Sequence, residues 1–139
     1  MAAVLVDAGV LVRCLDPNDP GHPDAVASIK ATPGTPWTTW PVVTEAAHLL
    51  GRDYPPGRDE LLAMVADGAI SLARLDSDDI PRLRQLMAKY HDLPMDLADA
   101  TLVRIAERDG IDTVLTFDRR DFKVYRAAGI GALKILPKS

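Results

Sequence analysis

The chain is poor in the residues that hold zinc or form disulfides. It has one cysteine and three histidines among its 139 residues, and the histidines are scattered. Cys14 has no second cysteine with which to form an internal disulfide, so we expect a buried thiol that packs beside Leu11 and Leu15. The lack of clustered cysteines and histidines argues against zinc chemistry.

Long hydrophobic runs and a basic leader are also absent. No apolar run approaches the roughly 18 residues that a membrane span requires, and no Lys or Arg precedes Asp7. We therefore expect a cytoplasmic protein without membrane contact. A hydrophobic content of 47% and a charged content of 26% are typical of folded chains, and the length of 139 residues predicts a single domain over 1–139.

Strand-like and helix-like patterns alternate along the chain. Short apolar runs are followed by segments with helical spacing, which predicts an α/β fold with a central parallel sheet and helices on both faces. Predicted strands cover residues 2–6, 37–40, 69–75, 113–117 and 133–136. Predicted helices cover residues 10–15, 22–30, 60–66, 77–90 and 96–109, and a further helix begins at Pro41 and is broken at 54–57.

Two acidic residues, Asp7 and Asp118, each follow directly after a predicted strand. In an open α/β sheet the carboxyl ends of the strands form the ligand crevice, so both carboxylates are expected to face the same place. An alternative reading remains open for each residue, because an acid after a strand also begins a turn or caps the next helix.

Glu45 is predicted to lie on the buried side of a helix. It is one helical turn from Val42 and from Leu49. A buried carboxylate without a partner costs several kcal/mol or becomes protonated, so we expect a cation or hydrogen-bond donors nearby. The alternative, an acid interacting with the helix dipole, is weaker because Glu45 lies past the first turn if Pro41 begins the helix.

Asp96 and Asp99 share one side of a predicted helix. Asp99 lines up with Leu102, Val103 and Ala106, which directs its carboxylate toward the sheet. We therefore assign Asp99 to a metal, and Asp96 to the helix cap, to indirect support of the ligands or to an alternate ligand role. The pair is also close to a capping box, which alone could explain both acids.

Several carboxylates in one crevice repel one another unless a positive charge lies between them. Oxygen ligands without Cys or His suit Mg²⁺ or Mn²⁺. Such an ion can orient a phosphate, activate a water and offset charge on the leaving oxygen, which indicates phosphodiester cleavage by one or two ions.

The charge distribution permits a nucleic-acid partner although the net charge is −4. Residues 119–139 hold six basic residues against one acid, a local net charge of +5, whereas the preceding residues carry −9. A cation bound by some of those acids would turn a repulsive crevice into one that attracts phosphate.

With these residues identified, the chain resembles the PIN-domain ribonucleases, and among them the VapC-type toxins of type II toxin-antitoxin pairs. The resemblance covers the whole chain. It rests on four groups of residues in the family's order and spacing: 4–7 with 10–12, 43–45, 96–100 and 115–122.

The resemblance implies a three-layer α/β/α PIN-like fold with a central parallel sheet, and a homodimer. It implies an endoribonuclease that needs Mg²⁺ or Mn²⁺, cleaves structured RNA such as tRNA or rRNA, and is neutralised by a cognate antitoxin protein. By position, Asp7, Glu45, Asp99 and Asp118 match the family's acidic cluster, and all four are predicted to act in catalysis and metal binding.

Two departures from the family pattern concern the neighbours of these acids. A hydroxyl residue often follows the first Asp in the family, whereas Ala8 and Gly9 stand here. Support for that Asp must therefore come from elsewhere, and Thr44 and Thr116 are the candidates. Asp121 is close enough in sequence to compete with Asp118 for the fourth role.

Arg119 and Arg120 follow Asp118 directly and are candidates for binding RNA phosphates, although a solvated surface pair is the alternative. A catalytically silent PIN-like module that binds RNA or protein would keep the same scaffold. A receiver-like or phosphatase domain is disfavoured, because no second Asp of a DxD motif follows Asp7.

Overall fold

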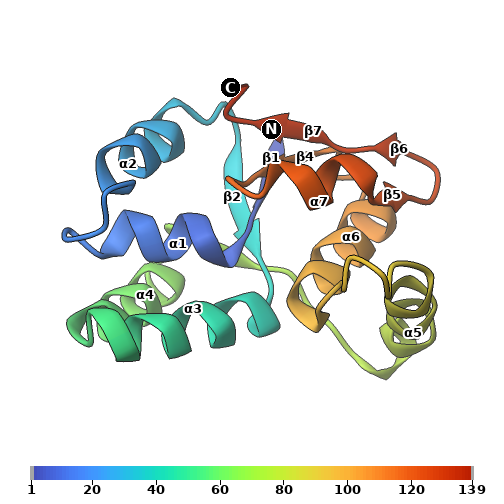
Figure 1. Cartoon of the computed structure of the whole chain (residues 1–139), viewed down its shortest axis with the longest axis horizontal. Coiled ribbons are helices and arrows are strands. Elements are labelled where there is room, and N and C mark those ends of the chain that lie inside the picture. Colours follow the sequence, from blue (N-terminus) through green and yellow to red (C-terminus); the bar gives the residue numbers. More distant parts are fainter. Residues whose placement is uncertain (1, 139) are drawn as a thin grey trace.

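Five parallel strands form one sheet at the centre of the protein (Figure 1). The computed structural model describes residues 2–138. The strand order is β3-β2-β1-β4-β7, and every neighbouring pair is parallel. The strands of this sheet are β1 (Ala3–Val6), β2 (Thr35–Thr38), β3 (Ser71–Leu72), β4 (Thr113–Leu115) and β7 (Lys134–Leu136).

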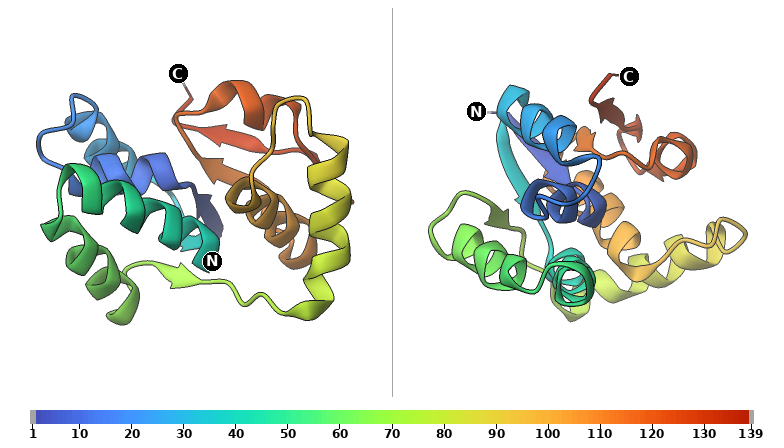
Figure 2. Two further views of the ribbon diagram at one scale, coloured as in Figure 1. Left: turned by 60° about the horizontal axis from the view of Figure 1, so that its bottom comes forward. Right: turned by 60° about the vertical axis from the view of Figure 1, so that its left-hand side comes forward.

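Helices cover both faces of the sheet, so the predicted three-layer α/β/α architecture is confirmed (Figures 1 and 2). Helices α1 to α4 gather on one side of the sheet, and α5, α6 and α7 lie on the other. The helices are α1 (Ala8–Leu15), α2 (His22–Ala31), α3 (Trp40–Asp53), α4 (Pro56–Ala66), the 3₁₀ helix η1 (Ser77–Asp79), α5 (Ile80–Lys89), α6 (Leu97–Asp109) and α7 (Arg119–Val124).

The order in which the chain adds strands to the sheet changes direction between β1 and β4, which are neighbours in the sheet. It runs from β1 outward through β2 to β3, and then returns to β4 and continues to β7. Val6 pairs with Leu115, and the backbone N–H of Asp7 donates to the carbonyl of Leu115 at 3.3 Å. The residues that follow β1 and β4 therefore meet at the switch point, where open α/β sheets bind their ligands.

Several element boundaries differ from the prediction. Strand β2 lies two residues earlier than expected, because Trp40 and Pro41 already belong to α3 and the N–H of Val43 bonds to the carbonyl of Thr39 at 3.0 Å. Helix α4 begins at Pro56, because proline is tolerated in the first turn, where its missing N–H has no helical partner. Strand β3 has only two residues, and the helix expected over 77–90 consists of η1 and α5.

Three short elements near the end of the chain were not predicted. Helix α7 has six residues and buries one large side chain, Phe122, so it shows no apolar periodicity. Strands β5 (Arg126–Ala127) and β6 (Gly131–Ala132) form an antiparallel pair of two residues each. Patterns of this length carry too few residues to reveal a period.

Cys14 packs against the margin of the core and is half-buried, which is less than the predicted burial of this thiol. Burial still raises the pKa of this thiol to about 11. Within residues 2–138, no helix combines the length and the apolar character needed to cross a membrane.

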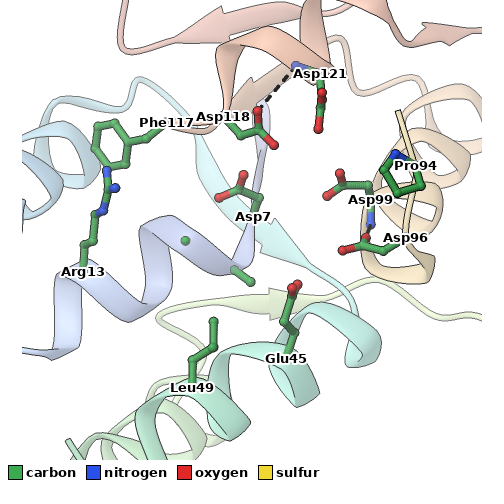
Figure 3. A pocket seen from close by; sticks show the side chains of 12 residues that line it. Asp7, Arg13, Glu45, Leu49, Pro94, Asp96, Asp99, Phe117, Asp118 and Asp121 are labelled. Atoms are coloured by element: carbon green, nitrogen blue, oxygen red, sulfur yellow. Dashed lines mark hydrogen bonds between the residues drawn. The ribbon is translucent and has the colours of Figure 1, made fainter. Parts of the chain in front are cut away.

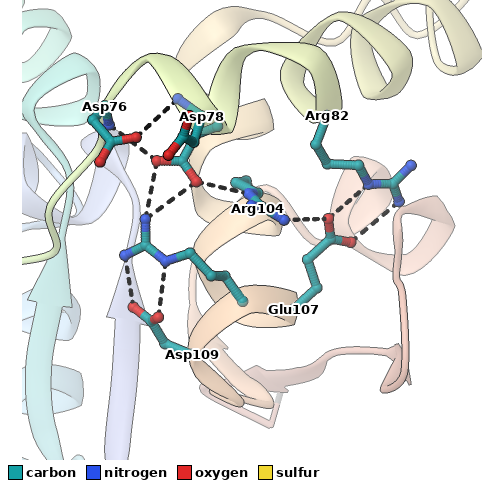
Figure 4. A network of polar contacts seen from close by, with 8 residues as sticks. Asp76, Asp78, Arg82, Arg104, Glu107 and Asp109 are labelled. Carbon is teal, nitrogen blue, oxygen red and sulfur yellow. Dashed lines mark hydrogen bonds and ion pairs between the residues drawn. The ribbon is translucent and has the colours of Figure 1, made fainter.

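A network of ion pairs joins η1 to α6, the helix that carries Asp99 (Figure 4). Asp79 is only 2% exposed and accepts hydrogen bonds from Arg104 Nε at 2.8 Å and Arg108 Nη1 at 3.0 Å. Burial raises the pKa of Asp79, but the backbone N–H of Asp76 and the two guanidinium groups outweigh burial and lower it. Asp79 therefore stabilises the fold as a carboxylate.

We expect Asp79→Asn to lower the free energy of unfolding by about 2 kcal/mol at neutral pH, because the charge-assisted hydrogen bonds weaken. Urea denaturation measures this difference. Folding lowers the pKa of Asp79, so the stabilisation by its carboxylate is present above the ordinary pKa and is lost as the pH falls. The free energies of unfolding of the two proteins should therefore become equal in acid. Asp109→Asn is the control, because Asp109 pairs with Arg108 at a more exposed position. Equal stability of wild type and Asp79→Asn at pH 7 would contradict this account.

Candidate metal centre

An acidic pocket with a volume of about 360 Å³ lies at the carboxyl ends of β1 and β4 (Figure 3). All the acids that the sequence analysis considered as metal ligands line this pocket, including the alternate candidates Asp96 and Asp121. The acids of this pocket are Asp7, Glu45, Asp96, Asp99, Asp118 and Asp121. The sequence-based expectation that acids from distant segments share one crevice is thus met by their positions in the fold.

Asp7 connects β1 to α1 and is 7% exposed. Its Oδ1 accepts the backbone N–H of Val10 at 3.2 Å and so caps α1, and its Oδ2 accepts the hydroxyl of Thr116. Burial raises the pKa of Asp7, while the Thr116 hydroxyl and the Val10 N–H oppose the rise. The carboxylate therefore combines a capping role with a position in the pocket.

Thr116 links the acids that follow β1 and β4. Besides donating to Asp7, its buried Oγ1 accepts the backbone N–H of Asp118 at 2.9 Å. Its own backbone N–H bonds to the carbonyl of Leu136 in β7 at 2.9 Å. Of the two hydroxyls predicted to support Asp7, Thr116 makes the contact, whereas Thr44 is exposed on α3.

Asp99 projects from the first turn of α6 and receives a hydrogen bond that the sequence did not suggest. The hydroxyl of Tyr125 donates to Asp99 Oδ2 at 3.0 Å. Burial raises the pKa of Asp99 to about 8, the charge of Asp96 adds to the rise, and the Tyr125 hydroxyl opposes it. Asp96 caps α6 by accepting the Asp99 N–H at 2.8 Å, as expected. No spacing in the sequence pairs Tyr125 with Asp99.

Asp118 caps α7, with the backbone N–H of Asp121 donating to its Oδ1 at 3.4 Å. Asp99, Asp118 and Asp121 each offer a carboxylate oxygen, and these three atoms lie within 4.8 Å of one another. Burial raises the pKa of Asp121, and the neighbouring Asp118 raises it further. The fold therefore presents Asp118 and Asp121 together, and Asp7 faces the same space (Figure 3).

Glu45 approaches the pocket from α3, on the wall opposite Asp118 (Figure 3). It is half-buried, which is less than the prediction of a buried face implied. Burial raises its pKa, and the charges of Asp96 and Asp7 raise it further. A cation in the pocket would reverse these repulsions.

The donor set of the pocket fits a hard divalent cation. Its acidic residues supply only oxygen atoms, and neither Cys nor His lines it among the described residues. Oxygens bound to one Mg²⁺ at about 2.1 Å lie up to about 4.2 Å apart, so small side-chain rotations would bring the three clustered carboxylates into coordination. Carboxylate oxygens are the kind of ligand that Mg²⁺ and Mn²⁺ prefer.

The two arginines expected to bind phosphate do not line the acidic pocket. The Nη1 of Arg119 donates to the carbonyl of Pro137, and Arg119 is half-buried. Arg120 is exposed on α7. Among the described residues that line the pocket, Arg13 is the only basic one, and sequence reasoning overlooked it because Arg13 lies six residues after Asp7 within a largely apolar helix.

The chain is similar to known proteins in sequence and in fold. The PIN domain family model matches residues 4–128. Ribonuclease VapC26 of Mycobacterium tuberculosis (strain ATCC 25618 / H37Rv) is 29% identical over 137 residues, which cover 96% of this chain and 100% of that protein. The crystal structure of VapC20, a sarcin-ricin loop cleaving toxin of Mycobacterium tuberculosis, matches with a TM-score of 0.74 and 16% identity, over 80% of this chain and 86% of that one. At that identity the structural match concerns the fold alone.

Proposed function

The chain belongs to the PIN-domain family, and from this premise we propose that it is a Mg²⁺- or Mn²⁺-dependent endoribonuclease, the toxin of a type II toxin-antitoxin pair. The sequence likeness to a ribonuclease, VapC26, supports the activity. The observation that carries the proposal is the cluster of Asp99, Asp118 and Asp121 oxygens within 4.8 Å, beside the buried Asp7. We propose that residues 1–139 act as one nuclease domain.

We assign roles to the acids from their positions. Asp7, Asp99 and Asp118 would hold the ion, with Asp121 or Asp96 as a further ligand or a support. When bound, a divalent ion supplies an activated water and offsets negative charge on the phosphate. The Tyr125 and Thr116 hydroxyls fix the orientation of Asp99 and Asp7 through their hydrogen bonds.

Glu45 is placed to accept a proton. Its carboxylate faces the other acids across the pocket, and burial raises its pKa, which makes it a stronger base. In the proposed reaction the water oxygen attacks phosphorus, the bond from phosphorus to the 3′ oxygen breaks, and the water proton passes to Glu45. The 3′ oxygen takes a proton from solvent, so the products carry a 5′-phosphate and a 3′-hydroxyl.

The products and the metal requirement test the proposal together. Purified protein is incubated with total cellular RNA in Mg²⁺, Mn²⁺ or EDTA, and the new ends are sequenced. We expect discrete fragments with 5′-phosphates in either metal and none in EDTA. Cyclic 2′,3′-phosphate ends, or cleavage that continues in EDTA, would contradict the proposed chemistry. Binding of RNA without cleavage in any metal would favour the alternative, a catalytically silent binding module.

The partners follow from the same proposal. We propose structured RNA such as tRNA or rRNA as the substrate, and a cognate antitoxin protein as the inhibitor. VapC20, which shares the fold, is a toxin that cleaves the sarcin-ricin loop. We further propose a homodimer that acts in the cytoplasm.

Tyr125→Phe is expected to weaken Mn²⁺ binding about tenfold at pH 7. The hydroxyl of Tyr125 holds down the pKa of Asp99, so its removal raises that pKa further and leaves less carboxylate to bind the ion. Because protons compete less at higher pH, the difference should shrink at pH 9. Isothermal titration calorimetry measures both affinities. Tyr90→Phe is the control, since the Tyr90 hydroxyl bonds to the backbone of Arg126 instead. Equal affinities of Tyr125→Phe and wild type at pH 7 would rule out this role.

A further inference from the structure

We propose that Arg13 and Phe117 form a phosphate subsite on one side of the acidic pocket, which binds the phosphodiester next to the one that is cleaved. The proposal rests on the function proposed above and extends it to the path of the RNA strand. Its ligand is an internal phosphodiester of single-stranded RNA.

The first support is the geometry of the pair. The guanidinium carbon of Arg13 lies 4.9 Å from the centre of the Phe117 ring. Phe117 directly precedes Asp118, and both Arg13 and Phe117 line the acidic pocket. In Figure 3 the pair lies on the side of the pocket away from Asp99 and Asp96. The pocket thus has an acidic side and a side that is cationic and aromatic.

The second support is the charge of the pocket. Six carboxylates line it, and Arg13 is the only basic residue among the described lining residues. A divalent ion at the acidic side would offset the charge of one phosphate. Among the described residues that line the pocket, Arg13 is the one cation that can contact the next phosphate of the strand.

The third support is that neighbouring residues restrain the side chain of Arg13 while part of it remains exposed to solvent. Its Nε lies 3.9 Å from Asp19 Oδ1, a loose ion pair, and its side chain is 42% exposed. A Cβ atom at Gly21 would come within 2.9 Å of Arg13 Cδ, so the glycine lets the loop pack closely on the stem of the arginine. The cation–π contact with Phe117 adds to this restraint, and a guanidinium carries several N–H donors that can bind a phosphate.

A purely structural role for Arg13 predicts a different experimental result, and the chain offers a matched control. Lys89 Nζ lies 5.2 Å from the centre of the Tyr90 ring, which is a second contact of a cation with an aromatic ring. Lys89 does not line the acidic pocket. Lys89→Gln therefore removes a similar packing contact without removing a cation from the pocket.

The first measurement is the salt dependence of RNA binding. Fluorescence anisotropy follows a short, fluorescein-labelled single-stranded RNA of mixed sequence with Mg²⁺ present, and Asp7→Asn is added to every variant to prevent cleavage. Arg13→Gln is expected to weaken binding about tenfold and to reduce the slope of log K against log salt by about 0.7, the value for one phosphate contact on a single strand. Arg13→Lys should keep the slope, and Lys89→Gln should change neither quantity. An unchanged slope in Arg13→Gln would overturn the proposal.

The second measurement identifies the phosphate. Oligonucleotides carrying one neutral methylphosphonate linkage are tested, with the linkage moved along the strand. With Arg13 present, a neutral linkage at the subsite should weaken binding, and in Arg13→Gln that same linkage should have no effect. Identical profiles for the two proteins would overturn the subsite while leaving the nuclease intact. Failure of the unaltered chain to cleave RNA in any metal would contradict the proposed function, and the linkage profile would still report on the phosphate contact.

Discussion

Asp99→Asn is expected to reduce RNA cleavage on the order of 1,000-fold and, at the same time, to raise the melting temperature of the metal-free protein. Both effects have one cause. Asp99 sits among carboxylates, and burial with the nearby charge of Asp96 raises its pKa to about 8. The carboxylate that would bind the ion is therefore unfavourable for the fold when no ion balances it.

The pH dependence of stability gives the sign of this effect. The pKa of Asp99 rises from an ordinary value of 3.8 to about 8 on folding, so the folded state binds the proton more tightly than the unfolded state. Stability therefore falls as the pH rises from about 4 to about 8. Asn carries no charge, so the variant should escape part of this loss. In EDTA at pH 8 we expect its melting temperature to be about 3 to 6 °C higher, the shift that about 1 kcal/mol gives in a domain of this size.

Thermal denaturation in EDTA at pH 5 and pH 8 measures the change in melting temperature, and cleavage assays in Mg²⁺ measure the loss of activity. The difference in melting temperature should be small at pH 5. Asp96→Asn tests the alternate ligand, because Asn caps helices as well as Asp does and cleavage should persist if Asp96 only caps α6. A lower melting temperature of Asp99→Asn at pH 8, or full cleavage by it, would contradict the account.

Thr116→Val is expected to lower cleavage about 10- to 100-fold and stability by about 1 to 3 kcal/mol. The hydroxyl donates to Asp7 and accepts the backbone N–H of Asp118, and the side chain is buried. Valine has nearly the same shape but leaves the Asp118 N–H without its acceptor and frees the Asp7 carboxylate to turn. Single-turnover cleavage and urea denaturation give the two values.

Two variants separate the hydroxyl from other effects of the substitution. Thr116→Ser keeps the hydroxyl, so it should restore most of the cleavage. Thr44→Val removes the exposed hydroxyl of the other candidate and should leave cleavage unchanged. If Thr116→Ser were as impaired as Thr116→Val, the methyl group and not the hydrogen bonds would be responsible.

The sequence predicted the acids of the pocket because their positions follow from topology. Asp7 and Asp118 come directly after β1 and β4, and in a parallel sheet the ends of adjacent strands must meet. Asp99 was placed by helical periodicity relative to a strongly apolar face. An acid after a strand and the apolar period of a helix can both be read from a short segment of sequence. The rule that brings these acids together, that ends of neighbouring parallel strands meet, holds for any open α/β sheet.

The alternative interpretation was that these acids cap helices, and the structure shows that the same acids can cap helices and line the acidic pocket. Asp7, Asp96 and Asp118 cap α1, α6 and α7, and all three line the acidic pocket. Three helix N-termini therefore point at the pocket, where their dipoles favour negative charge. This arrangement helps the fold to tolerate several carboxylates at one place.

Other parts of the site could not be predicted, because they depend on contacts between distant segments. The hydroxyl of Tyr125 reaches Asp99 across 26 positions, and its ring packs edge-on against Phe122 with centroids 5.2 Å apart. Arg13 lines the pocket, and the loop that ends at Gly21 packs against its stem. Helix α7 is too short to show a period, so the sequence did not predict the helix that Asp118 caps.

The most direct test of the metal centre is anomalous diffraction from crystals grown or soaked with Mn²⁺. The account predicts an anomalous peak inside the acidic pocket, within coordination distance of carboxylate oxygens of Asp99 and Asp118 and facing Asp7. It also predicts that this peak is lost in Asp99→Asn. A pocket without an anomalous peak at saturating Mn²⁺, or a peak bound only at acids elsewhere on the surface, would contradict the central claim.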